Sequence, residues 1–462
     1  MTSSRRIGAS FRDPSGFLFS RGGILFRQVN HNYRPSYDLL VSSGLQEELV
    51  EGGWLIPHEV VKEPPADETL ASLVLRPEPI AFVSYPYEWC FSQLKDAALL
   101  TLAIQERALG RGLTLKDSSA YNIQFHQGRP VLIDSLSFEP WTEGEPWVAY
   151  RQFCRHFLAP LALMARVDIR IGDLLRIHID GLPLDLTSHL LPGKTRLQPG
   201  LLAHIHLHAA SQRRYAGTAP EAASKSRMSL NAMRGLVDSL KSTVGGLDWA
   251  PGGTDWADYE QEHNYSAAAL ESKRRLVAGY IDRIRPKSTW DLGANVGTFS
   301  RLAAEAGSTT IAFDLDPSAV EVHYRRCRER GEKNVLPLRL DLSNPSPAQG
   351  WAHGERMSLA ERGPADVVMA LALIHHLAIA NNVPLSMVAE TLASYGRWLI
   401  LEFVPKSDSQ VQRLLSSRKD IFTDYTLEGV QEAFRRSHSI RAMDRVKDSE
   451  RVLFLMEKRQ ET

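Results

Sequence analysis

The second half of the chain alternates short apolar runs with amphipathic segments, and this alternation limits the possible folds more than any other feature. The expected strands are 288–291, 309–314, 334–341, 365–373, 398–404, 439–446 and 451–458, and the expected helices are 267–284, 299–307, 317–331, 384–396 and 426–437. Alternating strands and helices favour an α/β fold, a mostly parallel, doubly wound sheet of seven strands with helices on both faces. The last two strands have no helix between them, which predicts an antiparallel hairpin at one edge.

The sequence DLGANVG, residues 291–297, connects the first expected strand to the next helix. Glycine allows a tight turn and a close approach of the backbone to a ligand, and the following helix start offers free N–H groups. Sheets of this kind bind ligands beyond the carboxyl ends of their strands. The dinucleotide fingerprint G-x-G-x-x-G fits poorly, because Asn295 stands at its second glycine and the third is absent.

The pattern Asp291-x-Gly293-x-Asn295-x-Gly297 resembles motif I of class I S-adenosylmethionine-dependent methyltransferases, a Rossmann-like family. Asp314 lies 21 residues after Gly293, where an acid can accept hydrogen bonds from ribose hydroxyls, although NAD also needs such an acid.

Two further matches follow in the family's order. Asp341 matches the acid that holds the adenine amino group, and residues 365–377 resemble motif IV. The resemblance covers about residues 265–460 and implies S-adenosyl-L-methionine as cofactor, bound by these four motif I residues with Asp314 and Asp341. The alternative is a methyltransferase-like fold that has lost its cofactor.

Candidate catalytic residues follow the fourth and fifth expected strands. If the acceptor carries a weakly acidic proton, a general base is needed, and His375 or His376 could supply it. At least one of the two histidines is expected to be structural, and His376 is the candidate base. Glu402 ends the fifth strand and could bind the substrate or only cap a loop.

The first half carries a different pattern, in which Asp117, Asn122 and Asp134 surround a short apolar strand. This pattern resembles the base and magnesium ligands of aminoglycoside-phosphotransferase-like kinases. Leu115 and Lys116 replace the usual residues before the first Asp, and no convincing nucleotide-binding lysine is present. The sequence therefore leaves open an N-terminal α+β domain with phosphotransferase activity, where the second half would be regulatory, and a non-enzymatic substrate- or partner-binding module.

Composition indicates where the domains end and which classes of partner to expect. Stretches rich in small residues predict a first domain at 1–215, a linker with a possible helix at 216–255 and a methyltransferase domain at 256–462. Lys plus Arg and Asp plus Glu both number 54, so nothing points to nucleic acid, and no apolar stretch predicts a membrane span. The three cysteines form no disulfide pattern, which fits a cytoplasmic protein.

The sequence HIHLH could hold zinc through His204, His206 and His208, but no nearby acid or cysteine completes a ligand set, so no metal site is expected. Over its whole length the chain resembles bacterial methyltransferases related to a rhizobial host-specific nodulation protein. This resemblance implies a glycan, lipid-linked or small-molecule acceptor. It leaves the acceptor atom and the oligomeric state open.

Overall fold

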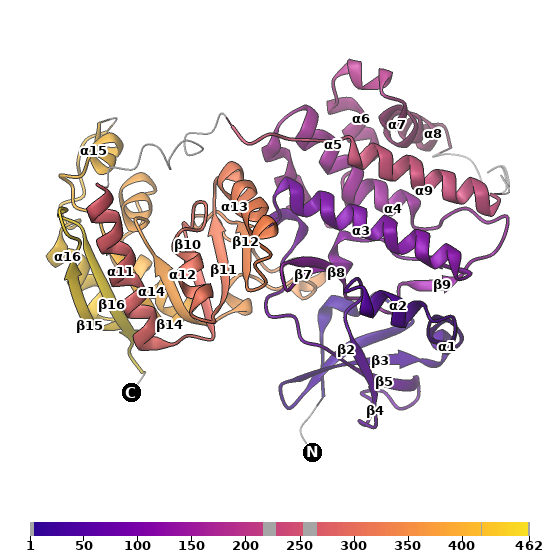
Figure 1. Ribbon diagram of the computed structural model, residues 1–462, viewed down its shortest axis with the longest axis horizontal. Coiled ribbons are helices and arrows are strands. Elements are labelled where there is room, and N and C mark those ends of the chain that lie inside the picture. Colours follow the sequence, from indigo (N-terminus) through magenta and orange to yellow (C-terminus); the bar gives the residue numbers. More distant parts are fainter. Residues whose placement is uncertain (1–3, 216–227, 253–265, 417, 461–462) are drawn as a thin grey trace. The chain divides into compact units, whose positions relative to one another are not determined.

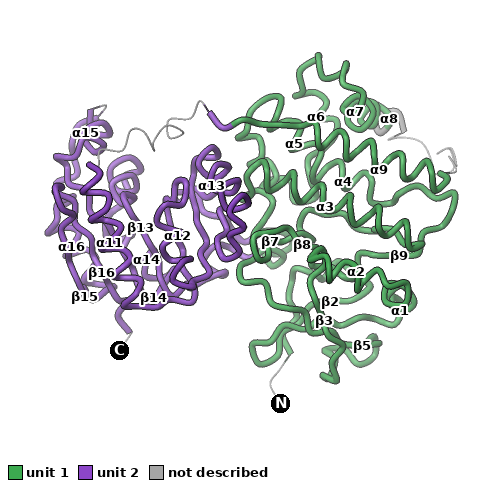
Figure 2. Tube along the Cα trace, in the orientation of Figure 1, with its two compact units in different colours: residues 1–250, 349–356 green, residues 251–348, 357–462 purple. Residues whose placement is uncertain are grey.

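The computed structural model describes residues 4–215, 228–252, 266–416 and 418–460. The chain forms two compact units (Figure 2). Unit 1 comprises Met1–Ala250 and Gln349–Arg356, and unit 2 comprises Pro251–Ala348 and Met357–Thr462. Within the described residues, no helix is both long and apolar enough to span a membrane.

Unit 1 is an α+β unit, with its main sheet at the amino-terminal end, helices α1 and α2 between two strands of that sheet, and the remaining helices after it (Figure 1). The main sheet is antiparallel and has the strand order β1-β2-β3-β5-β4, while β6 pairs with β9 and β7 with β8. The strands are β1 Arg5–Arg6, β2 Gly16–Arg21, β3 Ile24–Asn30, β4 His58–Val61, β5 Ala71–Pro77, β6 Leu113–Leu115, β7 Ile123–His126, β8 Arg129–Leu132 and β9 Phe138–Pro140. The α-helices are α1 Arg34–Ser42, α2 Leu45–Glu51, α3 Phe91–Gly110, α4 Tyr150–Phe153, α5 Ala159–Arg166, α6 Leu184–Leu190, α7 Pro199–Leu201, α8 His208–Tyr215 and α9 Leu230–Gly245.

Helix α9 lies in the interval expected as a linker, yet it is packed into unit 1 beside α3. Its buried residues Met233, Val237, Leu240 and Val244 recur at helical spacing and form one apolar face. Lys95 of α3 donates to the carbonyl oxygen of Gly245 at 2.9 Å. The helix is therefore part of the first unit, and residues 216–227 and 253–265 of the expected linker lie outside the described residues.

Unit 2 contains the predicted seven-stranded sheet, in the order β12-β11-β10-β13-β14-β16-β15. Strands β10 to β14 are parallel, and β16 pairs antiparallel with both β14 and β15. The strands are β10 Ser288–Leu292, β11 Thr309–Asp314, β12 Val335–Arg339, β13 Ala365–Ala370, β14 Gly396–Phe403, β15 His438–Arg445 and β16 Val452–Lys458. The helices are α11 Ala267–Ile284, α12 Ser300–Glu305, α13 Pro317–Arg330, α14 Leu385–Tyr395, α15 Ser409–Leu415 and α16 Leu427–Arg435.

Both faces of this sheet are covered, as the uninterrupted apolar strands predict. Val367 and Met369 of β13 pack in one cluster with residues of α11, including Val277. Val368, between them, is also fully buried and must point to the opposite face, because successive strand residues alternate. The predicted α/β fold is therefore confirmed.

The strand order reverses at β10, which lies between β11 and β13. The chain runs outward from β10 through β11 to β12 and then returns to add β13 on the other side. Such a switch point leaves a crevice at the carboxyl ends of the strands. It fixes where the candidate site of unit 2 is found.

Candidate active site

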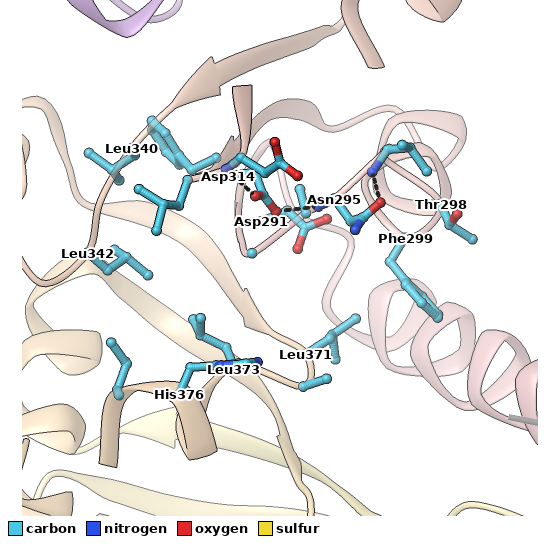
Figure 3. A pocket seen from close by; sticks show the side chains of 18 of the residues that line it. Asp291, Asn295, Thr298, Phe299, Asp314, Leu340, Leu342, Leu371, Leu373 and His376 are labelled. Atoms are coloured by element: carbon cyan, nitrogen blue, oxygen red, sulfur yellow. Dashed lines mark hydrogen bonds between the residues drawn. The ribbon is translucent and has the colours of Figure 1, made fainter. Parts of the chain in front are cut away.

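A cavity of about 670 Å³ lies at this switch point in unit 2 (Figure 3). Its size is within the usual range for small-molecule sites. Of the residues expected to bind the cofactor, the structure brings five into the cavity wall: Asp291, Gly293, Asn295, Asp314 and Asp341. Gly297 belongs to the same turn but does not line the cavity.

The turn after β10 is held by hydrogen bonds to β11 and requires left-handed backbone. Gly293 and Asn295 have φ angles of 78° and 48°. The N–H groups of Gly293 and Ala294 both donate to the carbonyl oxygen of Phe313 at 2.9 Å. The N–H of Asn295 donates to Asp314 Oδ2 at 2.7 Å. Asparagine tolerates this backbone better than most residues, so the departure from glycine at this position is accommodated.

Two carboxylates beside this turn carry raised pKa values. Burial raises the pKa of Asp291 to about 6, although Ser300 Oγ donates to its Oδ2 at 2.6 Å. Burial likewise raises the pKa of Asp314 to about 6, against the hydrogen bonds from the N–H groups of Asp316 and Asn295. In this unit, Asp341 accepts from the N–H and the hydroxyl of Ser343 at 2.8 and 2.6 Å. Carboxylates whose pKa is raised by burial in a cavity are typical of binding sites.

The two adjacent histidines have different environments. Their ring centroids are 4.2 Å apart. His376 lines the cavity, and burial lowers its pKa below the usual value. His375 is 3% exposed, does not line the cavity, and its Nδ1 has no hydrogen-bond partner among the described residues. One ring faces the cavity and the other is buried, although the two histidines lie in a helical turn beyond β13 and not at the end of the strand itself.

Glu402 does not reach the cavity. It is fully buried, and its Oε2 accepts from Lys273 Nζ at 2.7 Å. Arg451 lies on its other side, with Nη1 3.8 Å from Glu402 Oε1, and bonds Asp408 at 2.8 Å. Glu402, for which the sequence left open a substrate contact or a loop cap, thus lies in a buried chain of charges.

Lys273 is a cavity residue that the sequence analysis missed. It projects from α11, and its ammonium lies 4.5 Å from the ring centroid of Phe299, which also lines the cavity. A signal was present in the sequence: Lys273 lies four residues after Ala269 and four before Val277, within the buried stripe of the helix. A lysine in an apolar stripe is unusual unless it is paired.

The three kinase-like residues of unit 1 lie in one cluster, and the guanidinium group of Arg27 lies among them. Arg27 Nη2 lies 2.6 Å from Asp134 Oδ1. Asn122 Nδ2 donates to Ser137 Oγ, which in turn donates to Asp134 Oδ2. Burial, followed by repulsion from Asp134, raises the pKa of Asp117. Arg27 was missed by the sequence analysis, although an arginine inside the apolar strand ILFRQVN is a comparable signal.

The histidines of HIHLH are held by packing and hydrogen bonds in unit 1. They lie on a π-helical segment, Leu202–Leu207, and at the start of α8 rather than on a strand. The two ring nitrogens of His204 bond Tyr150 and Ser239, both at 2.8 Å. His206 bonds the hydroxyls of Ser188 and Thr195. These contacts give His204 and His206 structural roles.

Comparison with known proteins places the chain in a family. No protein-family model matches it. It is 35% identical over 461 residues to the nodulation protein NoeA of Rhizobium meliloti (strain 1021), covering 98% of this chain and 96% of that protein. The chain belongs to the NoeA family of nodulation proteins.

Solved structures also show similarity. One is the magnesium protoporphyrin IX methyltransferase ChlM of Synechocystis PCC 6803 with bound SAH, at 15% identity and a TM-score of 0.32, covering 44% of this chain and 93% of that one. Another is the N-methyltransferase NodS of Bradyrhizobium japonicum WM9, at 8% identity and a TM-score of 0.31, covering 42% and 99%. A third is the bifunctional kinase-methyltransferase WbdD, at 13% identity and a TM-score of 0.30, covering 45% and 43%.

Proposed function

We propose that unit 2 transfers a methyl group from S-adenosyl-L-methionine to a small-molecule, glycan or lipid-linked acceptor. One observation carries the proposal: the cavity at the switch point joins the glycine–asparagine turn to the carboxylates of Asp314 and Asp341, which follow adjacent strands. These groups suit a nucleoside, because carboxylates accept from hydroxyl and amino groups. The motif order in the sequence supports the same conclusion.

The donor set and the size of the cavity fit this cofactor. Asp314 would accept from the ribose hydroxyls and Asp341 from the adenine amino group, while Leu340 and Leu342 add apolar wall between them. When bound, the cofactor supplies an electrophilic methyl group on a sulfonium. The protein's task is then to hold the acceptor in line and to exclude water.

His376 is proposed as the base that takes a proton from the acceptor. Burial lowers its pKa, so the ring is neutral at neutral pH and can accept a proton. It lines the cavity, and the structure describes it at the start of a short helical segment, His376–Ala380, beyond β13. His375 is proposed as a structural neighbour.

Calorimetric titration with S-adenosylmethionine tests the proposal. Asp314→Ala should weaken binding by about 1.5–3 kcal/mol, the usual contribution of a hydrogen bond to a charged group. Asp282→Ala is the matched control, because Asp282 is an exposed acid on α11 outside the cavity wall. Absence of binding by the wild-type protein, or equal affinities of the two variants, would refute the proposal. Comparing metabolites of a deletion strain with its parent would then identify the acceptor.

For unit 1 we propose a binding role without phosphoryl transfer. Arg27 occupies the position beside Asp134 at which a magnesium ion would have to bind, and its side chain is only 9% exposed. A guanidinium held between two carboxylates, Asp134 and Asp13, is costly to displace. A thermal-shift measurement of the full chain with ATP tests this: adding Mg²⁺ should give no further stabilisation. Stabilisation that Asp134→Ala abolishes would instead support a phosphotransferase.

A further inference from the structure

A second, smaller pocket lies in unit 1. It has a volume of about 400 Å³ and is lined by Val148, Arg151, Gln152, Arg155, His156 and Asp180. Most of these residues come from α4 and the π-helical turn Cys154–Leu158 that follows it. No residue proposed above for methyl transfer contributes to this pocket.

The pocket carries an excess of positive charge. Arg151 and Arg155 are four residues apart on a helical segment, so they lie on the same side of it and repel each other. Asp180 is the only carboxylate in the described wall. Neither arginine forms an ion pair within the part of the chain that the structure describes, although Asp180 and Asp185 lie close enough to favour the charged form of Arg155.

Two nitrogen atoms of the pocket residues have no hydrogen-bond partner among the described residues. One is Nε of Arg155, whose Nη2 donates to the carbonyl oxygen of Gly181 at 3.1 Å. The other is Nδ1 of His156, a side chain that is only 3% exposed. Burial lowers the pKa of His156 to about 3, so the ring is neutral and offers one N–H. Buried polar atoms without partners cost free energy unless a ligand satisfies them.

We infer that this pocket binds a compact oxyanion, the phosphate or carboxylate group of a small ligand, between Arg151 and Arg155. Guanidinium groups offer paired N–H donors that match the oxygens of both groups. The inference does not rest on methyl transfer by unit 2, since the pocket lies entirely within unit 1.

The pocket borders the cluster around Asp117. Gln152 lines the pocket, its Oε1 accepts from the N–H of Ser118 at 2.8 Å, and its side chain lies close enough to the Asp117 carboxylate to lower the pKa of that acid. A ligand held by its anionic group therefore lies next to Asp117. This gives unit 1 a ligand class, small phosphorylated or carboxylated molecules, that needs no magnesium ion at Asp134.

Titration of the full chain with inorganic phosphate, and separately with acetate, tests the inference at constant ionic strength. Arg151→Gln and Arg155→Gln should each weaken binding about tenfold or more, because each removes a charged donor. Arg129→Gln removes an exposed arginine of β8 outside the pocket and should leave binding unchanged. Stronger binding of phosphate than of acetate would assign a phosphorylated ligand, and the reverse a carboxylate.

The inference is overturned if the wild-type protein binds neither probe, or if the pocket variants and Arg129→Gln bind alike. Arg151 is exposed, so its replacement leaves the fold intact and keeps the test decisive even if Arg155→Gln does not fold. S-adenosylmethionine titration of the same variants separates this outcome from a failure of unit 2. It should give wild-type affinity in all of them.

Discussion

The two units each gather acidic side chains that end or follow strands, but the charge of Asp134 in unit 1 is compensated, whereas that of Asp314 in unit 2 has no cation partner among the described residues. In unit 1, Asp134 is bound to Arg27 at 2.6 Å and to the hydroxyl of Ser137. In unit 2, Asp314 receives only backbone N–H bonds, its pKa is raised to about 6, and it lines a cavity of about 670 Å³. A carboxylate with an internal cation stabilises the fold, whereas one that faces a cavity at a raised pKa is available to a ligand.

The largest effect is expected where unit 1 loses its internal cation. Arg27→Met would leave Asp134 and Asp13 without their shared partner, and breaking such a buried pair costs about 3–5 kcal/mol. Urea unfolding should show this loss in the free energy of unfolding. Arg76→Met, in the same sheet, removes an exposed ion pair with Glu59 and should cost less than about 1 kcal/mol. Equal losses in the two variants would break the comparison.

A second prediction concerns the histidines beside the cavity of unit 2. His376→Ala should lower the rate of methyl transfer about 100-fold, the usual contribution of a general base, and leave cofactor affinity unchanged. His375→Ala should change stability more than rate, because its ring is buried outside the cavity wall. Transfer of labelled methyl groups from S-adenosylmethionine into a metabolite extract of the host bacterium measures both. Near-normal rates in both variants would indicate catalysis by positioning alone.

Asp314→Asn should separate stability from binding. The raised pKa means that the ionised carboxylate is disfavoured in the folded state, a cost that is present above about pH 6 and disappears toward the unfolded pKa near 4. Replacing it should stabilise the ligand-free protein by about 1 kcal/mol at neutral pH while weakening cofactor binding. The stabilisation, measured by urea unfolding, should shrink between pH 7 and pH 5. If Asp314→Asn instead destabilises the protein, the Asp314 carboxylate stabilises the fold, as that of Asp134 does.

The smallest expected effect is a proton released on cofactor binding. Asp291 and Asp314 have pKa values of about 6, and hydroxyl donors from the ribose would favour the ionised form of Asp314. Binding near pH 6 should therefore release a fraction of a proton, and affinity should fall below this pH. Calorimetry in two buffers with different ionisation enthalpies measures the release. Identical heats at pH 6 would contradict the raised pKa.

Local patterns predicted the sheet of unit 2, whereas contacts between distant residues escaped the sequence analysis. The strand at 309–314 and the helix at 267–284 have the expected bounds, because buried parallel strands are continuous apolar runs and caps mark helix ends. Lys273 was missed because its partner Glu402 is 129 residues away. Arg27 was missed for the same reason, because its partner Asp134 is also distant in the sequence. A helix at α9 was expected as possible, but its packing beside α3 was not.

Gly297 has a φ of 83°, and a Cβ atom there would lie 1.9 Å from Nε2 of His323 on α13. The contact demands glycine whether or not a cofactor is ever bound. A descendant of this protein that no longer binds the cofactor should therefore keep Gly297. Asp314 should be replaced, because its buried carboxylate destabilises the folded protein. Among relatives, an acid at the position of Asp314 should therefore be a better marker of retained cofactor binding than the glycine-rich turn itself.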